Sequence, residues 1–468
     1  MSALMVQGVS SSAGKSLLVT AFARWFARRG VRVAPFKGQN MSNNARVVGG
    51  GEIGVAQYLQ ALAAGIPPDV RMNPVLVKPE GDTRSQVVVD GRADLALSAL
   101  PWRERGPRLW PPIERALREL LAEYDLVLLE GAGSPAEINL LETDLANMRS
   151  ARVADAAVVL VADIDRGGVF AHLYGTWRLL PQPDRPRVRG FVLNKFRGDP
   201  TLLAPAPELL EEHTGVPTLG VLPQLVHGLP DEDGAATPPL RGDRPRVAVV
   251  RYPTASNLDE FRPLEQVVDL VWAAVPAELD GAALVVLPGS KHVAADRAWL
   301  TARGFDGALR SRVARGGRLL AICGGLQLAG ERFDDPAGVD GSGAGLGLLP
   351  LRTTFSADKL VRRRRAVFTA LPEPWSDLSG VELEGYEIRH GASEAVSPLR
   401  EAVPGGLGWV AGSVLAIYLH GLFEHEAAVQ ALLGAGPAQS LDRTFDELAD
   451  AVDRHLDMNS VAALAGVA

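Results

Sequence analysis

The sequence contains a single cysteine, Cys323, among its 468 residues. One cysteine excludes an internal disulfide framework and a zinc site built from cysteines, and it fits a reducing cytoplasm. No segment approaches the ~18 consecutive apolar residues that a membrane-spanning helix needs. Residues 1–16 lack the basic stretch and apolar core of a secretory signal. These absences predict a cytoplasmic protein without a membrane partner.

An excess of positive charge is also missing. The chain has 48 Lys and Arg against 55 Asp and Glu, a net charge of -7, which disfavours a general nucleic-acid surface. Hydrophobic residues make up 47% and charged residues 22%, the balance of a folded globular protein. A chain of this length is too long for one hydrophobic core, so we expect two domains with small molecules as partners. The sequence leaves the oligomeric state open, including a homo-oligomer.

Short apolar runs alternate with helical stretches along the chain, which is the pattern of an α/β fold. Continuous apolar runs of this length fit strands that are buried on both faces of a parallel sheet. Helices are expected between them, for example over residues 16–29 and 112–123. The expected strands are residues 4–8, 31–35, 126–130, 157–163, 191–194 and 219–222 in the first half, and 247–250, 283–287, 319–323 and 414–419 in the second.

A stretch rich in Pro, Gly and Asp, residues 229–245, interrupts this alternation. Its composition is typical of an interdomain linker. The sequence therefore predicts two domains, residues 1–228 and residues 246–440, each a mostly parallel sheet flanked by helices. Residues 441–468 are predicted to be a helical segment with an apolar face that packs back onto one domain.

A glycine- and serine-rich loop joins the first expected strand to the first helix and reads Gly-Val-Ser-Ser-Ser-Ala-Gly-Lys-Ser. In this context the backbone N–H groups and the helix N-terminus favour bound phosphate. Lys15 is expected to reach the β- and γ-phosphates of ATP, and the Ser16 hydroxyl to bind Mg²⁺. The predicted ATP-binding loop comprises Gly8, Ser12, Gly14, Lys15 and Ser16, with one residue more between its glycines than the common phosphate loop.

Polar side chains end the later strands of the first domain. Ligands gather there, because the carboxyl ends of parallel strands meet at one edge of the sheet. Glu130 is a suitable metal ligand, bound directly or through water. Asp163 and Asp165 follow the next strand, and Asn194 follows the one after, where its amide could bind the adenine edge. Each could instead cap a helix or form a turn. Together with the phosphate loop they favour one site.

Cys323 lies in Leu-Leu-Ala-Ile-Cys-Gly-Gly-Leu-Gln, an apolar strand that leads through the cysteine into two glycines and a helix. This pattern is typical of a nucleophile elbow, in which a sharp turn lifts the sulfur above the sheet and the helix N-terminus favours thiolate. A lone cysteine is otherwise commonly buried filler. We predict that Cys323 is a nucleophile. The N–H groups of Gly289, Ser290 and Gly324 are the predicted oxyanion hole.

The base for Cys323 is expected to be a histidine distant in sequence. His420 is the best placed, because the expected strand over residues 414–419 delivers it at its end. His390, in Gly-Tyr-Glu-Ile-Arg-His-Gly, is the alternative. In this arrangement the sulfur attacks a carbonyl carbon and the imidazole protonates the leaving group.

The C-terminal half resembles a class I glutamine amidotransferase domain through the segments Leu-Pro-Gly-Ser-Lys, Ile-Cys-Gly-Gly-Leu-Gln and Tyr-Leu-His-Gly. The resemblance implies that Cys323 attacks the side-chain amide of glutamine and releases ammonia. Many such domains carry a glutamate two residues after the histidine, which completes a triad. Here that position is Leu422, and the nearest acid is Glu424, so no third triad member is predicted.

The phosphate loop, with its extra residue, resembles the dethiobiotin synthetase-like branch of P-loop enzymes, and the chain as a whole resembles the cobyric acid synthase family. This second resemblance covers nearly all of the sequence. Its markers include Pro-Phe-Lys-Gly-Gln-Asn-Met-Ser-Asn-Asn, Glu-Gly-Ala-Gly-Ser-Pro-Ala-Glu-Ile-Asn-Leu, Asp-Ile-Asp-Arg-Gly-Gly and Tyr-Glu-Ile-Arg-His-Gly. It implies ATP- and glutamine-dependent amidation of the b, d, e and g carboxylates of adenosylcobyrinic acid a,c-diamide, through acyl phosphates, with ATP and Mg²⁺ as cofactors.

By motif position, the resemblance makes Lys37 and Asp144 candidates for holding the substrate carboxylate or the metal. The complete expected substrate or acyl-phosphate site is Lys37, Gln39, Asn40, Asp144, Asp163 and Asp165, and the expected metal ligands are Ser16 and Glu130. Ammonia released into neutral water would be mostly protonated and no longer nucleophilic. A shielded route from Cys323 to the phosphate loop is therefore expected.

Two alternatives remain at this stage. The sister cobyrinic acid a,c-diamide synthase has the same plan, but it carries an acidic Gly-Pro-Asp-Tyr-like segment where this chain has Phe-Lys-Gly-Gln-Asn-Met-Ser-Asn-Asn. A regulatory P-loop ATPase with a degenerate amidotransferase domain is disfavoured by the presence of both Cys323 and His420. Four consecutive arginines, residues 362–365, form either a solvated strand edge or a contact with the corrin or the other domain. The sequence also leaves the role of His292 undecided.

Overall fold

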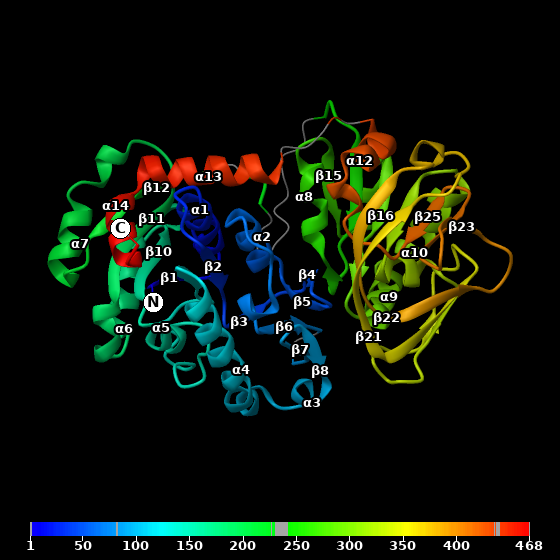
Figure 1. The fold of residues 1–468 in the computed structure, drawn as a ribbon. Coiled ribbons are helices and arrows are strands. Elements are labelled where there is room, and N and C mark those ends of the chain that lie inside the picture. Colours follow the sequence, from blue (N-terminus) through cyan, green and yellow to red (C-terminus); the bar gives the residue numbers. More distant parts are fainter. Residues whose placement is uncertain are drawn as a thin grey trace.

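The computed structural model describes residues 2–80, 83–225, 227–229, 242–434, 436 and 440–467, and the structural statements below concern these residues. The predicted linker, residues 229–245, lies mostly outside them. Figure 1 shows two α/β halves side by side, the first built from the N-terminal part of the chain and the second from the part that begins at β13.

The first half is organised around a six-stranded parallel sheet in the order β12-β11-β10-β1-β9-β2. Each of its strands matches one of the apolar runs predicted in the first half of the sequence. The strands are β1 (Ser2–Gly8), β2 (Val33–Phe36), β9 (Leu126–Glu130), β10 (Ala157–Asp163), β11 (Val188–Phe196) and β12 (Thr218–Pro223).

Helices cover both faces of this sheet, which is why its strands are apolar without alternation. In β1, Ala3 and Met5 belong to the apolar cluster on one face, whereas Leu4 and Val6 belong to the cluster on the other. The helices of this half are α1 (Lys15–Ala27), α2 (Val55–Ala63), α3 (Leu95–Ser98), α4 (Trp102–Glu123), α5 (Met148–Ala154), α6 (Val169–Leu179) and α7 (Ala206–Thr214).

The predicted start of α4 is wrong. We expected the helix over residues 112–123, with proline at its first turn, but it begins at Trp102 and contains Pro107, Pro111 and Pro112. The buried face continues through this stretch with Leu109 and Trp110, and packing of that face offsets the hydrogen bonds that the prolines cannot donate.

Short strands that the sequence did not reveal lie between the two halves in Figure 1. They form a four-stranded sheet in the order β3-β6-β7-β8 and a separate hairpin, β4-β5. Their bounds are β3 (Gln39–Met41), β4 (Ala45–Val48), β5 (Gly51–Gly54), β6 (Val75–Pro79), β7 (Ser85–Val89) and β8 (Arg92–Asp94). Strands this short, several of them polar, carry too little hydrophobic periodicity to be recognised.

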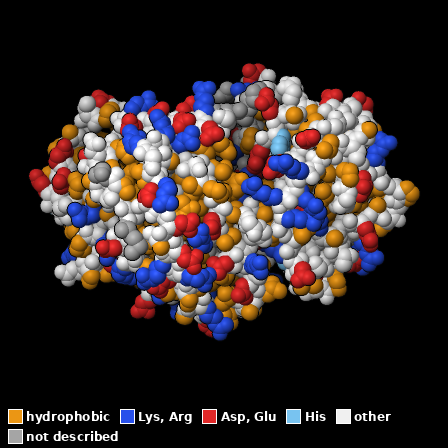
Figure 2. All heavy atoms as spheres, viewed as in Figure 1, with side chains coloured by type: hydrophobic (Ala, Val, Ile, Leu, Met, Phe, Trp, Pro, Cys, Tyr) orange, Lys and Arg blue, Asp and Glu red, His pale blue; other side chains and the backbone are white. Residues whose placement is uncertain are grey.

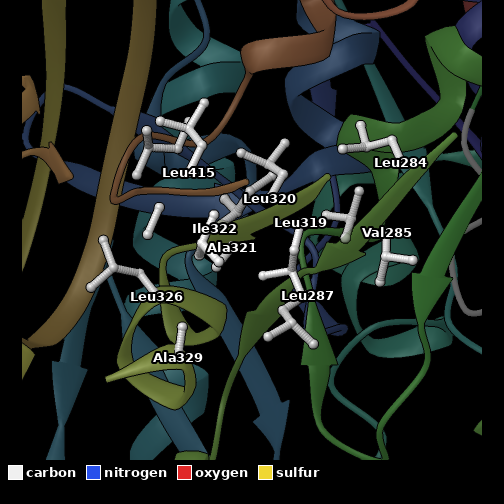
Figure 3. Packing of buried hydrophobic residues seen from close by; sticks show 14 of the residues in the cluster. Leu284, Val285, Leu287, Leu319, Leu320, Ala321, Ile322, Leu326, Ala329 and Leu415 are labelled. Carbon is white, nitrogen blue, oxygen red and sulfur yellow. The ribbon is translucent and has the colours of Figure 1, made fainter. Parts of the chain in front are cut away.

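The second half is built on a seven-stranded sheet in the order β15-β13-β16-β18-β25-β24-β23. The first five of these strands run parallel, and β24 and β23 add an antiparallel edge. The strands are β13 (Arg246–Val250), β15 (Asp269–Ala273), β16 (Leu284–Leu287), β18 (Leu319–Ile322), β23 (Arg400–Val403), β24 (Gly408–Ala411) and β25 (Val414–Ile417). Figure 3 shows Leu287, Leu320 and Leu326 among the packed apolar side chains around this sheet.

The remaining elements of the second half surround this sheet. The longest strands, β21 (Leu351–Val367) and β22 (Glu382–Ala395), pair antiparallel in a sheet of order β20-β19-β21-β22, with β19 (Arg332–Asp334) and β20 (Gly343–Ala344). A two-stranded ribbon joins β14 (Ala255–Ser256) to β17 (Gly289–Ser290). The helices are α8 (Arg262–Glu265), α9 (Val293–Ala302), α10 (Phe305–Ala314), α11 (Gly324–Ala329) and α12 (Glu426–Leu433).

The C-terminal helices α13 (Leu441–His455) and α14 (Met458–Ala465) return to the first half and pack on α1, β1 and β12 (Figure 1). Arg24 pairs with Asp446 at 2.8 Å and Arg28 with Asp450 at 2.6 Å. The two ends of the described chain meet where Ser2 Oγ donates to Gly466 O.

The surface in Figure 2 carries Lys and Arg interspersed with Asp and Glu, so the face in view has no extended field of one sign. Among the described residues, no helix combines the length and the apolar character that crossing a bilayer would require.

Candidate functional site

The phosphate loop connects β1 to α1 and is tightly packed. Gly14 adopts φ 107°, a left-handed conformation that favours glycine, and a Cβ there would lie 2.0 Å from Asn194 Nδ2. Lys15, the first residue of α1, points back over the loop. Its Nζ lies 3.2 Å from Ser10 O and 3.3 Å from Gly133 O, both of which are acceptors that hold the ammonium at the mouth of the loop.

Glu130, at the end of β9, is fully buried and is the centre of a polar cluster beside the loop. Its Oε1 accepts hydrogen bonds from Ser16 Oγ and Lys37 Nζ, each at 2.9 Å. Its Oε2 accepts from Gln57 and Gln60. The carboxylate thus joins the phosphate loop to the end of β2, as expected from neighbouring strands.

Hydroxyl and carboxylate oxygens are the ligands that Mg²⁺ prefers, so Ser16 and Glu130 fit the predicted metal site in chemistry. No group of three or more His, Cys, Asp or Glu that could hold a metal occurs in the described part of the chain. A magnesium ion here would therefore depend on nucleotide phosphates and water for most of its ligands.

Asn194 and Asp163 support the loop from the next two strands of the sheet. Asn194 Nδ2 donates to Ala13 O at 2.9 Å, so its amide braces the loop backbone, and its predicted contact with the adenine edge stays a prediction. Lys195 Nζ links Asp163 Oδ2, at 2.9 Å, to the carbonyl of Ser12, at 2.7 Å. Asp165 is exposed, and its Oδ1 lies 3.5 Å from Arg197 Nε.

Two cavities open at the phosphate loop. One of about 130 Å³ is lined by Ser12, Gly14, Lys15, Ser16 and Asn194. A larger one of about 580 Å³ lies between the two halves and is lined by Lys15, Lys37, Gln39 and Asn40 on one side and by Arg251, Asp259 and Arg262 on the other. Asp144 does not line this larger cavity. Its carboxylate accepts from the N–H groups of Ala146 and Asn147, and burial raises its pKa.

Cys323 follows β18 and precedes α11 with φ 51° and ψ -106°, a strained conformation for a side chain with a Cβ. Close packing explains the two glycines that follow it. A Cβ on Gly324 would lie 2.4 Å from Ser290 N, and one on Gly325 would lie 2.1 Å from Leu287 O. The predicted oxyanion-hole residues therefore touch the elbow from the neighbouring strand end.

His420 follows β25, the neighbour of β18, so both functional side chains lie at one sheet edge, and Cys323 Sγ donates to Ile388 O at 3.7 Å. His420 Nδ1 lies 2.8 Å from Glu260 Oε1, and Glu260 Oε2 accepts from Gly421 N at 3.0 Å. Burial alone would lower the pKa of His420. The charges of Glu260 and Cys323 outweigh burial and raise this pKa to about 10, which favours the protonated imidazolium.

Glu260 is the acid that the sequence analysis did not find. It follows β13, in the 3₁₀ turn Leu258–Phe261, and lies 160 residues before the histidine that it contacts. Leu422, the position examined for an acid, is buried and apolar. One signal in the sequence could have pointed to Glu260, namely its position after the apolar strand β13. The strands β13, β16, β18 and β25 all end at the same sheet edge, so a residue that follows β13 can come close to residues that follow β18 and β25.

The alternative base, His390, lines a cavity of about 50 Å³ together with Cys323. Its Nε2 lies 3.4 Å from Gln86 Nε2. Burial lowers the pKa of His390 to about 4, and nearby Lys359 adds to the effect. A neutral imidazole with these contacts differs from the cationic, carboxylate-bound His420.

A strand of the first half reaches into the cysteine site. Arg46, on β4, is buried and forms ion pairs with Asp259 and with Glu424. It also donates to the hydroxyl of Tyr386, whose ring stacks on His420 with centroids 5.2 Å apart. Glu424, which the sequence offered as the acid nearest to His420, thus forms an ion pair between the two halves.

The arginine run and His292 also have partners. Arg363 Nη2 donates to Tyr58 Oη of the first half at 2.7 Å, and Arg362 pairs with Glu387 at 2.6 Å. The run is therefore partly an interdomain contact. His292 Nδ1 lies 2.9 Å from Asp340 Oδ1 at the start of α9, where it caps the helix.

Comparison with known proteins defines the class first. The family model for the CobQ/CobB/MinD/ParA nucleotide binding domain matches residues 4–228, and that for the CobB/CobQ-like glutamine amidotransferase domain matches residues 246–428. A nucleotide-binding domain joined to a glutamine amidotransferase domain is the organisation of a glutamine-hydrolysing ligase.

Full-length relatives narrow this class. Cobyric acid synthase of Variovorax paradoxus (strain S110) is 57% identical over 97% of both chains, and that of Paracidovorax citrulli (strain AAC00-1) is 56% identical over 97% of both. Cobyric acid synthase of Polaromonas sp. (strain JS666) is 52% identical over 97% of this chain and 96% of its own. The chain belongs to the cobyric acid synthase family. The predicted family, α/β fold class and ligase class are confirmed.

Two solved structures each cover less than half of this chain. A structure described as a glutamine amidotransferase covers 44% of this chain and 98% of its own, at 17% identity and a TM-score of 0.31. Chloroplast FtsY from Physcomitrella patens covers 47% of this chain and 58% of its own, at 19% identity and a TM-score of 0.29.

Proposed function

We propose that this chain amidates the b, d, e and g carboxylates of adenosylcobyrinic acid a,c-diamide, with ATP as activator and glutamine as the source of ammonia. The observation that carries the proposal is the cavity of about 580 Å³ that opens on Lys15 of the phosphate loop and continues to the half that holds Cys323. Its lining is mixed in charge, with the acids Glu137, Asp259 and Glu265, and its cations Lys37, Arg251 and Arg262 suit a substrate with several carboxylates.

In the synthetase reaction, a substrate carboxylate oxygen attacks the γ-phosphorus of ATP, ADP leaves, and an acyl phosphate forms. Activation is needed because a carboxylate has no good leaving group. Lys15 binds the transferred phosphoryl group, and Lys37 neutralises the incoming carboxylate. Ser16 and Glu130, directly or through water, would hold Mg²⁺, which would supply charge neutralisation at the phosphates. Ammonia then attacks the acyl carbon and inorganic phosphate leaves.

In the glutaminase reaction, which supplies the ammonia, Cys323 Sγ attacks the side-chain carbonyl carbon of glutamine. The N–H groups of Ser290 and Gly324 stabilise the oxyanion. His420 gives its proton to the departing nitrogen, and ammonia leaves. Water then hydrolyses the thioester and releases glutamate. Glu260 fixes the ring orientation of His420 and favours its charged form, the role of a third triad member.

We also place the protein in the cytoplasm, with small molecules as its substrates and no nucleic acid or membrane as partner. Cys323 is a free thiol, which a reducing compartment preserves.

The test is synthesis by the purified protein with ATP, Mg²⁺, glutamine and adenosylcobyrinic acid a,c-diamide. Mass spectrometry counts the carboxylates converted to amides, and four successive conversions are expected. Cobyrinic acid without amides is the matched control substrate. Faster amidation of that control would assign the chain to the earlier diamide step and reject the proposal.

A further inference from the structure

The cavity at Cys323 contains more positive charge than the glutaminase chemistry uses. Three lysines line it, namely Lys78, Lys291 and Lys359. Their side chains are largely buried, with 4%, 12% and 8% of their surface exposed. Lys78 belongs to β6 of the first half, whereas the other two belong to the second half. Both halves of the chain therefore contribute cations to the cavity that holds the nucleophile.

Acidic partners neutralise only part of this charge. Glu52, which is on β5 and fully buried, binds Lys78 Nζ at 2.5 Å and also binds Lys359 Nζ. Lys291 Nζ lies 3.0 Å from Glu80 Oε1. Because two of the three lysines share one glutamate, this buried group carries one positive charge in excess.

The other charged side chains of the lining are already paired. Asp340 Oδ1 lies 2.9 Å from His292 Nδ1, and Arg389 Nη2 lies 2.7 Å from Glu387 Oε2. Burial and the two nearby lysines lower the pKa of Lys359 to about 7, although its carboxylate partner opposes this shift. An anion beside these ammonium groups would offset the cost of burying them.

The ammonium groups of Lys359 and Lys291 retain donors for such an anion. An ammonium has three N–H donors. Lys359 Nζ donates to Glu52 and to Gln86 Oε1, the latter at 2.8 Å, and Lys291 Nζ pairs with one carboxylate. Among the described residues, these contacts use two donors of Lys359 and one of Lys291.

Glutamine brings an anion of the required kind into this cavity. When its side-chain amide carbon is at Cys323 Sγ, its α-carboxylate, three carbon atoms further along, must be accommodated by the same lining. We propose that Lys291 and Lys359 bind this α-carboxylate. Glu52 and Lys78, both of the first half, position Lys359 for it. The inference rests on the proposed function, and it makes the first half part of the glutamine-binding site.

The experiment compares glutamine with glutaminamide, in which a neutral amide replaces the α-carboxylate. Ammonia release by the full chain gives kcat and KM for each substrate. Wild type should prefer glutamine by about 10²-fold or more in kcat/KM, because glutaminamide leaves the buried cations without an anion. Lys359→Met should lower this preference by about tenfold or more, through a higher KM for glutamine, with kcat/KM for glutaminamide little changed.

Three further variants locate the effect. Lys291→Met should lower the preference in the same way. Lys78→Met should lower it as well, because Glu52 then has Lys359 alone as its partner and neutralises it. Arg365→Met is the matched control, since it removes a cation from the same strand, β21, at a side chain that is 86% exposed. The control should keep the wild-type preference.

Because the preference is a ratio measured on one preparation, it does not depend on the fraction of active protein. Absence of a preference in wild type overturns the inference, as does an unchanged preference in both Lys359→Met and Lys291→Met or an equal loss in Arg365→Met. An unchanged preference in Lys78→Met overturns the role of the first half. If wild type releases no ammonia from glutamine, the proposed function fails instead, so the two failures are distinguishable.

Discussion

The phosphate site and the cysteine site differ in where their parts come from. Around Glu130, the contacting groups Ser16, Lys37, Gln57 and Gln60 all belong to the first half of the chain. The cysteine site has Cys323, His420 and Glu260 on one sheet edge, but the Tyr386 ring that stacks on His420 is held by Arg46 from the other half.

This difference indicates which site depends on contacts from the other half of the chain. The contacts around Glu130 all come from the first half of the chain, so these side chains are ordered by local packing and by the loop. The cysteine site has its nucleophile and base in place locally, yet the acid segment that contains Glu260 is braced by a cation from the partner half. Glutamine hydrolysis is therefore expected to depend on the contact between the halves more than phosphate binding does.

The largest effect is expected for Cys323→Ala, which tests whether the second site supplies only nitrogen. Glutamine-dependent synthesis should fall by about 10⁴-fold or more, because no other group replaces the thiolate. Added ammonium salt should restore synthesis, as measured by amides formed per corrin. Failure of ammonium to restore it would show that the cysteine half does more than release ammonia.

Lys15→Ala tests the opposite half. Synthesis should fall by roughly 10²–10³-fold with either glutamine or ammonium, because a charge that stabilises the transferred phosphoryl group is lost. Glutaminase activity should persist. Lys195→Ala is the matched control, because that lysine braces Ser12 O and Asp163 at the rim of the loop and its loss should cost less. An equal loss in the two variants would argue for a structural role of Lys15.

Much of this comparison could be predicted from the sequence. The strands of the first sheet and the elbow at Cys323 are local patterns, an apolar run followed by a loop of defined residue types. Glu260 was not predicted because its loop has no motif and its contact with His420 arises only when β13 and β25 share an edge. The contact of Arg46 was also missed, since a side chain that supports another half leaves no periodic signal.

Glu260→Gln sharpens the assignment of the acid. Loss of the carboxylate leaves burial to act on His420, so the pKa of His420 should fall from about 10. Glutaminase activity should drop roughly 10²-fold, and its alkaline limb should move to lower pH because the proton donor is lost earlier. A pH profile of glutamate release measures both changes. Glu424→Gln is the control, because Glu424 is partly exposed and, among the described residues, pairs with Arg46 and not with the imidazole. A larger loss of glutaminase activity in Glu424→Gln than in Glu260→Gln would assign the acid of the triad to Glu424 instead.

The smallest effect on activity, roughly tenfold, is expected for Arg46→Gln, which tests whether the halves are coupled through the acid segment. Burial raises the pKa of Asp259 to about 6, and Arg46 opposes that rise. Without the arginine the pKa should rise further, so the folded protein holds a proton that the unfolded chain has lost.

Stability of Arg46→Gln should therefore fall as the pH rises from the ordinary aspartate pKa of 3.8, and the fall should continue above about 6, where that of wild type levels off; thermal melting at acid and alkaline pH measures this slope. Arg28→Gln, which breaks an exposed ion pair with Asp450, is the matched control and should cost about 0–1 kcal/mol at either pH. If glutaminase activity in Arg46→Gln equals that of wild type, the cysteine site is as self-contained as the phosphate site.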